Sequence, residues 1–396
     1  MDDLLNRIDT ETDQSNCDII AYADDLALVL KGDSRREIEQ TGRKIINIVE
    51  NWCKLTKLKA STTKTTAILV KGKLSRLPTL KINNVNIKYE KKVKYLGIIV
   101  DNKLNFIEHA KYIRNKIVNF VMMLRRVTKE EWGLKTIIVK TFYSAVFVPI
   151  MTYGAIMWHD KAENYMVKRH LLAAQRSILL IITKACRTTS TIAMQTLSGI
   201  QPLDLTITRT GILSKIKRNV SVSWKEYSFR EKEDSSEIEV AKETEKLEGN
   251  IQAEWQERWT SDTHGRETFS FISDVAFASK NKWFTCGRHL TYLITGYGPI
   301  NSTLFKRNLI ENENCPSCTH LNETVDHILF DCVLYDNVRY EFLTRNKEHK
   351  ENLISNEEEF TKLLEFAKSV FEIRKKYISE EVEGSTEEEF RRGERW

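Results

Sequence analysis

The sequence predicts an α+β fold in residues 1–104, followed by a helical region and a small C-terminal region with clustered cysteines. Two short apolar runs around a turn in residues 17–30 predict a β-hairpin. Residues 33–57 then carry apolar side chains at helical spacing, and further strand-like runs follow. A hairpin, a helix and more strands in this order make an α+β unit.

The elements of this unit can be placed one by one. The helix begins after Asp33 and Ser34, whose short polar side chains suit an N-cap, and it has an apolar stripe that includes Ile45 and Trp52. Single strands are expected in residues 65–72 and 92–101, and a second hairpin in residues 79–89 with Asn83 and Asn84 at its turn.

Residues 105–215 predict a helical region, in which residues 141–158 carry no charge. This run is at the short limit for a membrane span and contains Pro149 and Gly154, so we expect a buried helix pair and no membrane contact. The remaining divisions are a charged linker in residues 216–250, an aromatic C-terminal region with three clustered cysteines in residues 251–345, and a helix and acidic tail in residues 346–396. Within the charged linker, residues 228–250 could also form a solvated helix.

The net charge of +6 conceals a strong local bias. Residues 54–94 hold twelve Lys/Arg and one acid, Glu90, which is a local balance of +11. Phosphate contacts supply most of the non-specific affinity for nucleic acids, so this block indicates a polyanion partner. A solvated lysine-rich surface is an equal alternative.

The cysteines indicate a metal site. The N-terminal run MDDLLNRIDTETDQ is too polar for a signal peptide, so we expect an intracellular location, in the nucleus or cytoplasm, where thiols stay reduced. Cys315, Cys318, His327 and Cys332 follow the spacing Cys-x2-Cys-x8-His-x4-Cys, which suits tetrahedral zinc. His320 is too close to Cys318 to be the preferred ligand. The alternative is three unrelated cysteines.

The run CDIIAYADDLALVL places Asp24 and Asp25 at the turn of the first predicted hairpin. Adjacent carboxylates repel, so they either lie on a solvated turn without a role or have a cation beside them. Hard Mg²⁺ prefers carboxylate oxygens, and a polymerase uses two divalent ions to stabilise the attacking 3′ oxygen and the departing pyrophosphate. Tyr22-Ala23-Asp24-Asp25 between two apolar strands favours that chemistry.

The run AYADDLALV resembles the catalytic hairpin of reverse transcriptases, specifically those of the non-LTR (LINE-like) retrotransposons of insects. The next palm motif of this family is similar to LKASTTKTTAILV, with Lys64 and Thr65 as its Lys-Thr pair, and the element after it resembles KVKYLGIIVDNKLNF. FVPIMTYGAIMW and ACRTTSTIAMQTLSGIQPLDL look like the helical thumb and connection, and the cysteine spacing is similar to the C-terminal zinc knuckle.

The resemblance implies a partial polymerase palm in residues 1–104, a helical thumb and connection in residues 105–215, and a CCHC zinc knuckle with structural Zn²⁺ in residues 251–345. It implies an RNA-directed DNA polymerase with Asp24 and Asp25 as Mg²⁺ ligands, acting on an RNA template and a DNA primer or target. Further implied site residues are Lys64, as a nucleotide-facing or proton-donating residue, and Tyr22, Lys57, Lys59, Tyr95, Gly97, Lys306 and Arg307, as nucleic-acid contacts.

Departures from the family's pattern limit these expectations. Lys57 stands where the family has glycine and Thr62 replaces a proline, which loosens a turn. The family's third metal-binding aspartate and its fingers lie upstream of the hairpin, where this chain has only 23 residues. We therefore expect the chain to be inactive alone, with an N-terminal half of the polyprotein missing. Alternatives are a non-catalytic nucleic-acid-binding remnant, which uses residues 54–94 and the zinc knuckle, and a product that does not fold.

Overall fold

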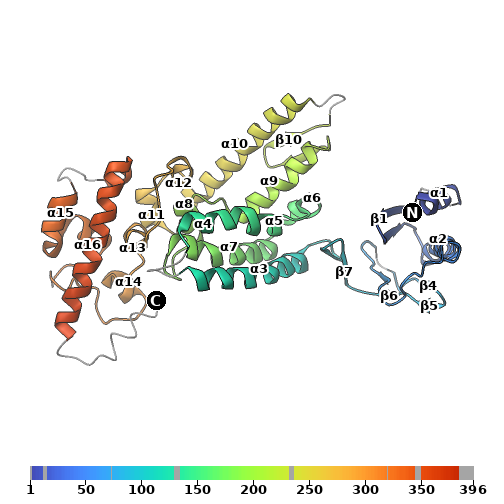
Figure 1. The fold of residues 1–396 in the computed structure, drawn as a ribbon, viewed down its shortest axis with the longest axis horizontal. Coiled ribbons are helices and arrows are strands. Elements are labelled where there is room, and N and C mark those ends of the chain that lie inside the picture. Colours follow the sequence, from blue (N-terminus) through green and yellow to red (C-terminus); the bar gives the residue numbers. More distant parts are fainter. Residues whose placement is uncertain are drawn as a thin grey trace. The chain divides into compact units, whose positions relative to one another are not determined.

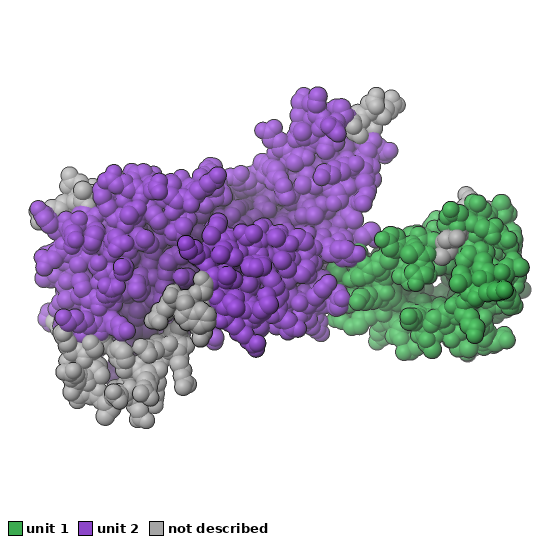
Figure 2. All heavy atoms as spheres, viewed as in Figure 1, with its two compact units in different colours: residues 1–109 green, residues 110–396 purple. Residues whose placement is uncertain are grey.

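The computed structural model describes residues 2–11, 16–72, 74–128, 134–231, 236–318, 320–343 and 349–382. The chain divides into two compact units, residues 1–109 (unit 1) and residues 110–396 (unit 2), which Figure 2 distinguishes by colour. Unit 1 combines short strands with helices, and unit 2 is mostly helical (Figure 1). This confirms the predicted α+β class.

Strands β1 (Cys17–Tyr22) and β2 (Asp25–Leu30) form the first predicted hairpin, with Cys17 opposite Leu30 and Tyr22 opposite Asp25. The Ser34 hydroxyl accepts a hydrogen bond from the Glu37 N–H (3.2 Å), so the next helix has the predicted N-cap. Helices α1 (Asp2–Glu11) and α2 (Arg35–Leu55) pack on one face of the hairpin, and the shared core contains Leu4, Ile8, Cys17, Ile45, Val49 and Trp52.

Strands β4 (Lys81–Ile82) and β5 (Val85–Asn86) form the second predicted hairpin. Asn83 and Asn84 have φ values of 49° and 61°, the left-handed conformation that this turn requires and that asparagine tolerates. The strand predicted for residues 65–72 was too long. Only β3 (Thr66–Ala67) forms, paired in parallel with β6 (Lys88–Tyr89) over two residues.

Residues 92–101 were predicted as one strand but form a hairpin of β7 (Lys92–Tyr95) and β8 (Ile98–Asp101). The chain reverses at Leu96 and Gly97, whose φ values are 44° and 84°. Leucine rarely adopts a positive φ, so the sequence gives little sign of this two-residue turn. The single glycine was its only signal.

Helix α2 ends in a turn that holds Lys57 in the left-handed conformation, with φ of 58°. The N–H groups of Lys57 and Leu58 donate to the carbonyls of Lys54 (3.4 Å) and Cys53 (2.9 Å), which is a Schellman motif. Glycine is favoured at this position because a side chain there costs about 1–2 kcal/mol. The motif forms although Lys57 replaces the glycine of the resembling family.

Replacing Lys57 by glycine is expected to stabilise the chain by about 1 kcal/mol, because the substitution removes the left-handed strain. Urea unfolding of the wild-type chain and of Lys57→Gly measures the difference. Lys59→Gly is the matched control, since Lys59 is also exposed and basic but has no positive φ. A Lys57→Gly variant that is less stable than the wild type would contradict the strain argument.

Unit 2 contains the helices expected in residues 105–215 (Figure 1). The longest are α3 (Ile107–Val127), which begins at the end of unit 1, and α7 (Tyr165–Thr183). The shorter ones are α4 (Thr136–Phe142), η1 (Tyr143–Phe147), α5 (Val148–Met151), α6 (Ala155–Trp158), η2 (His159–Lys161), α8 (Thr191–Ser198) and α9 (Leu203–Ile216).

The uncharged run of residues 141–158 forms buried helices on both sides of Gly154, as predicted. Phe147, Met151 and Trp158 are fully buried in unit 2. Among the described helices, none by itself is long and apolar enough to cross a bilayer. The segments Thr136–Met151 and Ala155–Lys161, bent by 55°, meet that requirement only when taken together.

Residues 216–250 were predicted to be a charged linker, with a solvated helix as the alternative for residues 228–250, and their described part belongs to the folded unit. Strands β9 (Val222–Trp224) and β10 (Tyr227–Phe229) pair there, and α10 (Glu237–Ser261) runs through the predicted boundary at residue 250. The helix buries Leu247, Ile251, Trp255 and Trp259 at helical spacing in a core shared with α9. Charged residues cover its other sides, and for this reason composition alone indicated a linker.

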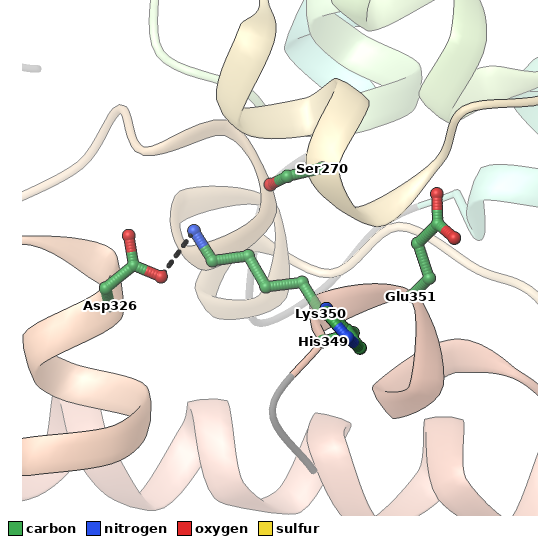
Figure 3. A pocket seen from close by; sticks show the side chains of 5 residues that line it. All are labelled: Ser270, Asp326, His349, Lys350 and Glu351. Atoms are coloured by element: carbon green, nitrogen blue, oxygen red, sulfur yellow. Dashed lines mark ion pairs between the residues drawn. The ribbon is translucent and has the colours of Figure 1, made fainter.

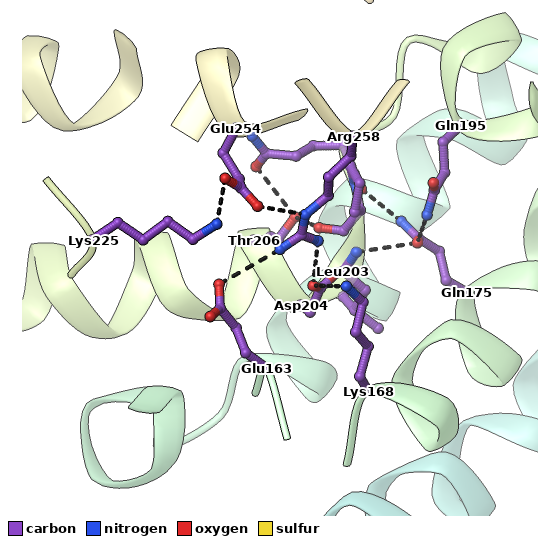
Figure 4. A network of polar contacts seen from close by, with 12 residues as sticks. Glu163, Lys168, Gln175, Gln195, Leu203, Asp204, Thr206, Lys225, Glu254 and Arg258 are labelled. Carbon is purple, nitrogen blue, oxygen red and sulfur yellow. Dashed lines mark hydrogen bonds and ion pairs between the residues drawn. The ribbon is translucent and has the colours of Figure 1, made fainter. Parts of the chain in front are cut away.

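A polar network joins α7, α9 and α10 (Figure 4). Asp204 is fully buried and pairs with Arg258 (2.6 Å) and Lys168 (3.3 Å). Arg258 also donates from Nε to Glu254 (2.7 Å) on its own helix. A buried carboxylate is tolerated only with such partners, so this network fixes α9 against its neighbours.

The C-terminal part has one core, to which α11 (Arg266–Phe271), α13 (Arg288–Thr295) and α16 (Glu357–Val382) contribute. Cys315 and Cys332 belong to the same core. Between these helices lie α12 (Phe277–Lys280), α14 (Asn301–Lys306), η3 (His327–Asp331), η4 (Val333–Tyr335), α15 (Asp336–Phe342) and η5 (Lys350–Ile354). Residues 383–396 of the predicted acidic tail lie outside the described residues.

Candidate metal centres and nucleic-acid surface

The hairpin of β1 and β2 presents the predicted aspartates at its tip. Ala23, with φ of 52°, and Asp24 form the two-residue turn, and Asp25 begins β2 opposite Tyr22. Both carboxylates are exposed, and neither makes a hydrogen bond or ion pair with any described residue. Two adjacent unpaired carboxylates concentrate negative charge, which a divalent cation would offset.

The face of the hairpin that carries Asp25 is apolar and open to solvent. The strand register places Tyr22, Ile20 and Val29 on this face, with 65%, 52% and 46% of their surface exposed. Tyr22, a predicted nucleic-acid contact, is therefore accessible next to the aspartates. Such a surface can support a flat or apolar group beside a bound cation.

The predicted basic residues of unit 1 follow α2. Lys57, Lys59 and Lys64 are all exposed. Ser61 organises the turn that presents Lys64, because its hydroxyl accepts a hydrogen bond from the Lys64 N–H (3.4 Å). The Lys64 side chain makes no hydrogen bond or ion pair with the described residues and is free to meet an anion.

Tyr95 and Gly97 lie at the turn between β7 and β8. The hydroxyl of Tyr95 is buried and has no hydrogen-bond partner among the described residues. Gly97 provides the positive φ of this turn. The structure joins neither residue to Asp24 or Asp25 by a hydrogen bond or ion pair, so a common role in one site stays a prediction.

The four predicted zinc ligands lie together. One ligand atom from each of Cys315, Cys318, His327 and Cys332 lies within 4.8 Å of the other three. The Sγ atom of Cys332 is 3.7 Å from that of Cys315 and 4.0 Å from that of Cys318. A disulfide would require about 2.0 Å, so the thiols are free. We call these four residues the Cys3His group.

Local hydrogen bonds bring the ligands to one point. The Cys315 N–H donates to the Leu321 carbonyl (2.7 Å), and the Leu321 N–H donates to the Cys318 carbonyl (2.8 Å). This tight loop presents the first two cysteines. His327 begins the π-helix η3, and the Cys332 N–H donates to the His327 carbonyl (2.7 Å), so the last two ligands occupy one turn.

The Cys3His group fits zinc. A tetrahedral ion with Zn–S bonds of about 2.3 Å holds its sulfurs roughly 3.8 Å apart. The observed sulfur distances of 3.7 and 4.0 Å match this spacing. Nε2 of His327 is buried without a hydrogen-bond partner among the described residues, as expected of a metal ligand. Burial raises the pKa of the Cys332 thiol to about 12, so the thiolate requires a cation nearby.

Lys306 and Arg307 lie at the C-terminal end of α14 (Asn301–Lys306). Lys306 is the last residue of this helix and Arg307 caps it, whereas the first residue, Asn301, donates from its side chain to the Asn314 carbonyl (2.7 Å). Lys306 is exposed and Arg307 is half-buried. The structure therefore places these two predicted contacts at the opposite end of α14 from the Cys3His group.

Sequence reasoning missed the charged residues around the Cys3His group. Glu323 and Arg374 are 1% and 5% exposed and form a two-bonded ion pair, with N–O distances of 2.9 and 2.6 Å. A signal was present, because Arg374 continues the apolar stripe of α16 after Leu363 and Val370, which are both fully buried. A charge on a buried helix face requires a partner.

A polar cavity adjoins the residue before His327. Lys350 pairs there with Asp326 (2.8 Å) and with Glu267 (2.5 Å), and its side chain is 9% exposed. The cavity is lined by Ser270, Asp326, His349, Lys350 and Glu351 (Figure 3). Lys350 is already paired with two carboxylates, so we assign no ligand to this cavity. It marks the place where η5 contacts the segment that carries His327.

Comparisons with known proteins indicate the family in which these features occur. Residues 1–100 match the reverse transcriptase (RNA-dependent DNA polymerase) family. The chain is 35% identical over 340 residues, 86% of its length, to the putative 115 kDa protein in type-1 retrotransposable element R1DM of Drosophila melanogaster. It is 31% identical over 330 residues to the retrovirus-related Pol polyprotein from type-1 retrotransposable element R1 3 of Nasonia vitripennis, covering 85% of that relative. No solved structure matches.

The hairpin with paired aspartates thus lies in a segment of the reverse transcriptase class. The chain belongs to the family of Pol polyproteins from type-1 (R1) retrotransposable elements, which confirms the insect non-LTR type indicated by its motifs. A further relative, the retrovirus-related Pol polyprotein from element R1 of Bradysia coprophila, is 36% identical over 81% of the chain. The chain spans about a third (32%) of the length of the Drosophila and Bradysia relatives.

Proposed function

We propose that this chain carries the catalytic hairpin of an RNA-directed DNA polymerase, with Asp24 and Asp25 as ligands of Mg²⁺. One observation supports this above all. Two exposed, unpaired carboxylates lie at a two-residue turn within the segment that matches the reverse transcriptase family. Carboxylate oxygens are the ligands that Mg²⁺ prefers, and a tight hairpin holds them in a fixed relation.

The proposal assigns a role to the exposed residues of the hairpin turn and to three lysines that follow α2. Asp24 and Asp25 bind the divalent ions next to the primer end, and Tyr22 supports the primer from the exposed face. Lys64, with Lys57 and Lys59, meets phosphates of the nucleotide or of the RNA template. Bound Mg²⁺ supplies Lewis-acid stabilisation of the attacking and leaving oxygens.

The two aspartates need a further ligand for polymerase chemistry. Among the described residues, the Cys3His group is the only set of three or more metal-ligating side chains, so no third carboxylate joins Asp24 and Asp25. We propose that another part of the polyprotein supplies it. The relatives from Drosophila and Bradysia are about three times longer than the aligned part, which gives room for such a segment.

The Cys3His group is proposed to hold Zn²⁺ as a structural ion. Three thiols and one imidazole at tetrahedral spacing are a closed ligand set without an open position for substrate. Cys315, His327 and Cys332 are 2%, 4% and 0% exposed, so a nucleic acid cannot touch them directly.

A second candidate function is non-catalytic binding of nucleic acid by the basic residues 54–94. Two observations favour it: residues 54–94 carry a net charge of +11, and Lys57, Lys59 and Lys64 within this segment are exposed. This function predicts an affinity for RNA that falls with salt and does not depend on the aspartates.

The affinity of the full chain for an RNA template paired with a DNA primer separates the two functions. We expect Mg²⁺ to raise this affinity several-fold in the presence of nucleotide, because Asp24 and Asp25 would hold the ion and its positive charge would attract phosphate. Asp24→Asn with Asp25→Asn should remove the Mg²⁺ effect. The control is Asp18→Asn, on the same hairpin, where Asp18 is paired with Lys31 (2.6 Å). An Mg²⁺ effect that survives in the double variant refutes the polymerase proposal and favours simple binding.

A further inference from the structure

We propose that Arg339 and Arg374 are positioning residues of the Cys3His group, each fixing one of the two chain segments that carry its ligands. Neither residue offers a metal ligand, and both come from helices that follow the group in sequence. The inference rests on the zinc site proposed above and does not depend on the polymerase reaction.

Arg374 fixes the segment that contains Cys315 and Cys318. Glu323 closes this segment, since its N–H donates to the Glu313 carbonyl (2.8 Å) on the other side of the loop. The Glu323 carboxylate then accepts two hydrogen bonds from Arg374, at 2.9 and 2.6 Å. A two-bonded Arg–carboxylate pair defines an orientation as well as a distance.

The same guanidinium also reaches the opposite flank of the loop. Arg374 Nη2 donates to the side-chain oxygen of Asn301 (2.8 Å), and the Asn301 amide donates to the Asn314 carbonyl (2.7 Å), one residue before Cys315. The Asn301 N–H donates to the Glu323 carboxylate as well (2.7 Å). Both ends of the cysteine loop are therefore tied to one buried side chain of α16.

Arg339 fixes the segment that runs from His327 to Cys332. Its guanidinium donates to the carbonyls of Leu329 (2.8 Å), Ile328 (3.3 Å) and Cys332 (2.9 Å). These carbonyls lie at the end of the π-helix η3, where a helix leaves its acceptors unpaired and a positive charge is favourable. Arg339 thus holds the turn that sets His327 and Cys332 side by side.

The metal site is consequently completed only when α15 and α16 pack on it. Residues around a metal that orient its ligands typically change affinity by about 10–100-fold when they are replaced. We therefore expect a looser ligand set, with weaker metal binding, when either arginine loses its multiple hydrogen bonds. Lysine keeps the charge but cannot form the two-bonded contacts.

The experiment measures Zn²⁺ affinity of the full chain by competition with a chromophoric chelator. Arg374→Lys and Arg339→Lys are each expected to bind Zn²⁺ about 10–100-fold more weakly than the wild type. The control is Lys280→Met, which breaks an exposed ion pair of unit 2 with Asp274 (3.2 Å) outside the Cys3His group and should leave Zn²⁺ affinity unchanged. Glu323→Gln, which keeps the shape of the side chain, is a second test in case a lysine variant does not fold.

Absorption of bound Co²⁺ adds a readout of ligand geometry. The wild type should show the intense visible bands of tetrahedral Co²⁺ with thiolate ligands, and the arginine variants should show weaker or shifted bands. Zn²⁺ affinities and Co²⁺ spectra equal to those of the wild type would overturn the positioning role. A wild-type chain that binds no Zn²⁺ would overturn the metal site itself, an outcome independent of the Mg²⁺ test at the hairpin.

Discussion

Removing the Zn²⁺ that we propose for the Cys3His group is expected to lower the melting temperature of unit 2 by roughly 10 °C. Free Zn²⁺ at about 1,000 times its Kd stabilises a folded protein by about 4 kcal/mol, and each kcal/mol corresponds to about 2–4 °C in a unit of this size. The effect should spread beyond the loop, because Cys315 and Cys332 belong to the core that α13 and α16 share. Calorimetry with and without a chelator measures it.

Two cysteine variants make this prediction specific. Cys332→Ser should melt early with or without the chelator, because its metal site has lost a ligand. Cys186→Ser replaces a buried cysteine outside the Cys3His group and should keep the full sensitivity to the chelator. Equal sensitivity to the chelator in both variants would show that the stabilising metal binds elsewhere.

Replacing Arg258 by methionine is expected to destabilise unit 2 by about 3–5 kcal/mol, since it leaves buried charge without its main partner. Asp204 is fully buried, and Lys168 at 3.3 Å is its remaining cation (Figure 4). Urea unfolding of the full chain measures the loss.

A surface ion pair provides the control for Arg258→Met. Lys280 pairs with Asp274 at 3.2 Å, and both side chains are at least half exposed. Lys280→Met should cost less than about 1 kcal/mol, because exposed pairs gain little from solvent-screened attraction. A loss at Arg258 as small as the one at Lys280 would mean that α9 is held by apolar packing alone.

The sequence predicted those elements whose local signals agree with their packing. The first hairpin has apolar runs on both sides of a turn, and α2 has both a capping serine and an apolar stripe. Asn83 and Asn84 tolerate the positive φ of their turn. The four side chains of the Cys3His group lie together as their spacing along the chain predicted, because a Cys-x2-Cys turn and a His-x4-Cys turn each bring two of them close.

Other features depend on contacts that no local pattern reveals. The turn at Leu96 has a residue that disfavours its conformation, and β3 pairs over only two residues with β6, a strand more than twenty residues further along the chain. The four-residue spacing of Trp255 and Trp259 indicated a packed helix face, but the charges of α10 conceal that this buried stripe extends back to Leu247 and Ile251. Arg374 meets Glu323 from 51 residues away, so only the folded chain shows that the two form a pair.

Cleavage of the chain by Fe²⁺ tests the proposed hairpin site most directly. Fe²⁺ can replace Mg²⁺ at carboxylate ligands, and with ascorbate and peroxide it generates hydroxyl radicals that cut the backbone near the bound ion. We expect cleavage between Tyr22 and Leu26, competed by Mg²⁺, retained in Asp18→Asn and lost when Asp24 and Asp25 are both asparagine. Cleavage that persists in the double variant, or that never occurs at this turn, would contradict a metal-binding role for the paired aspartates.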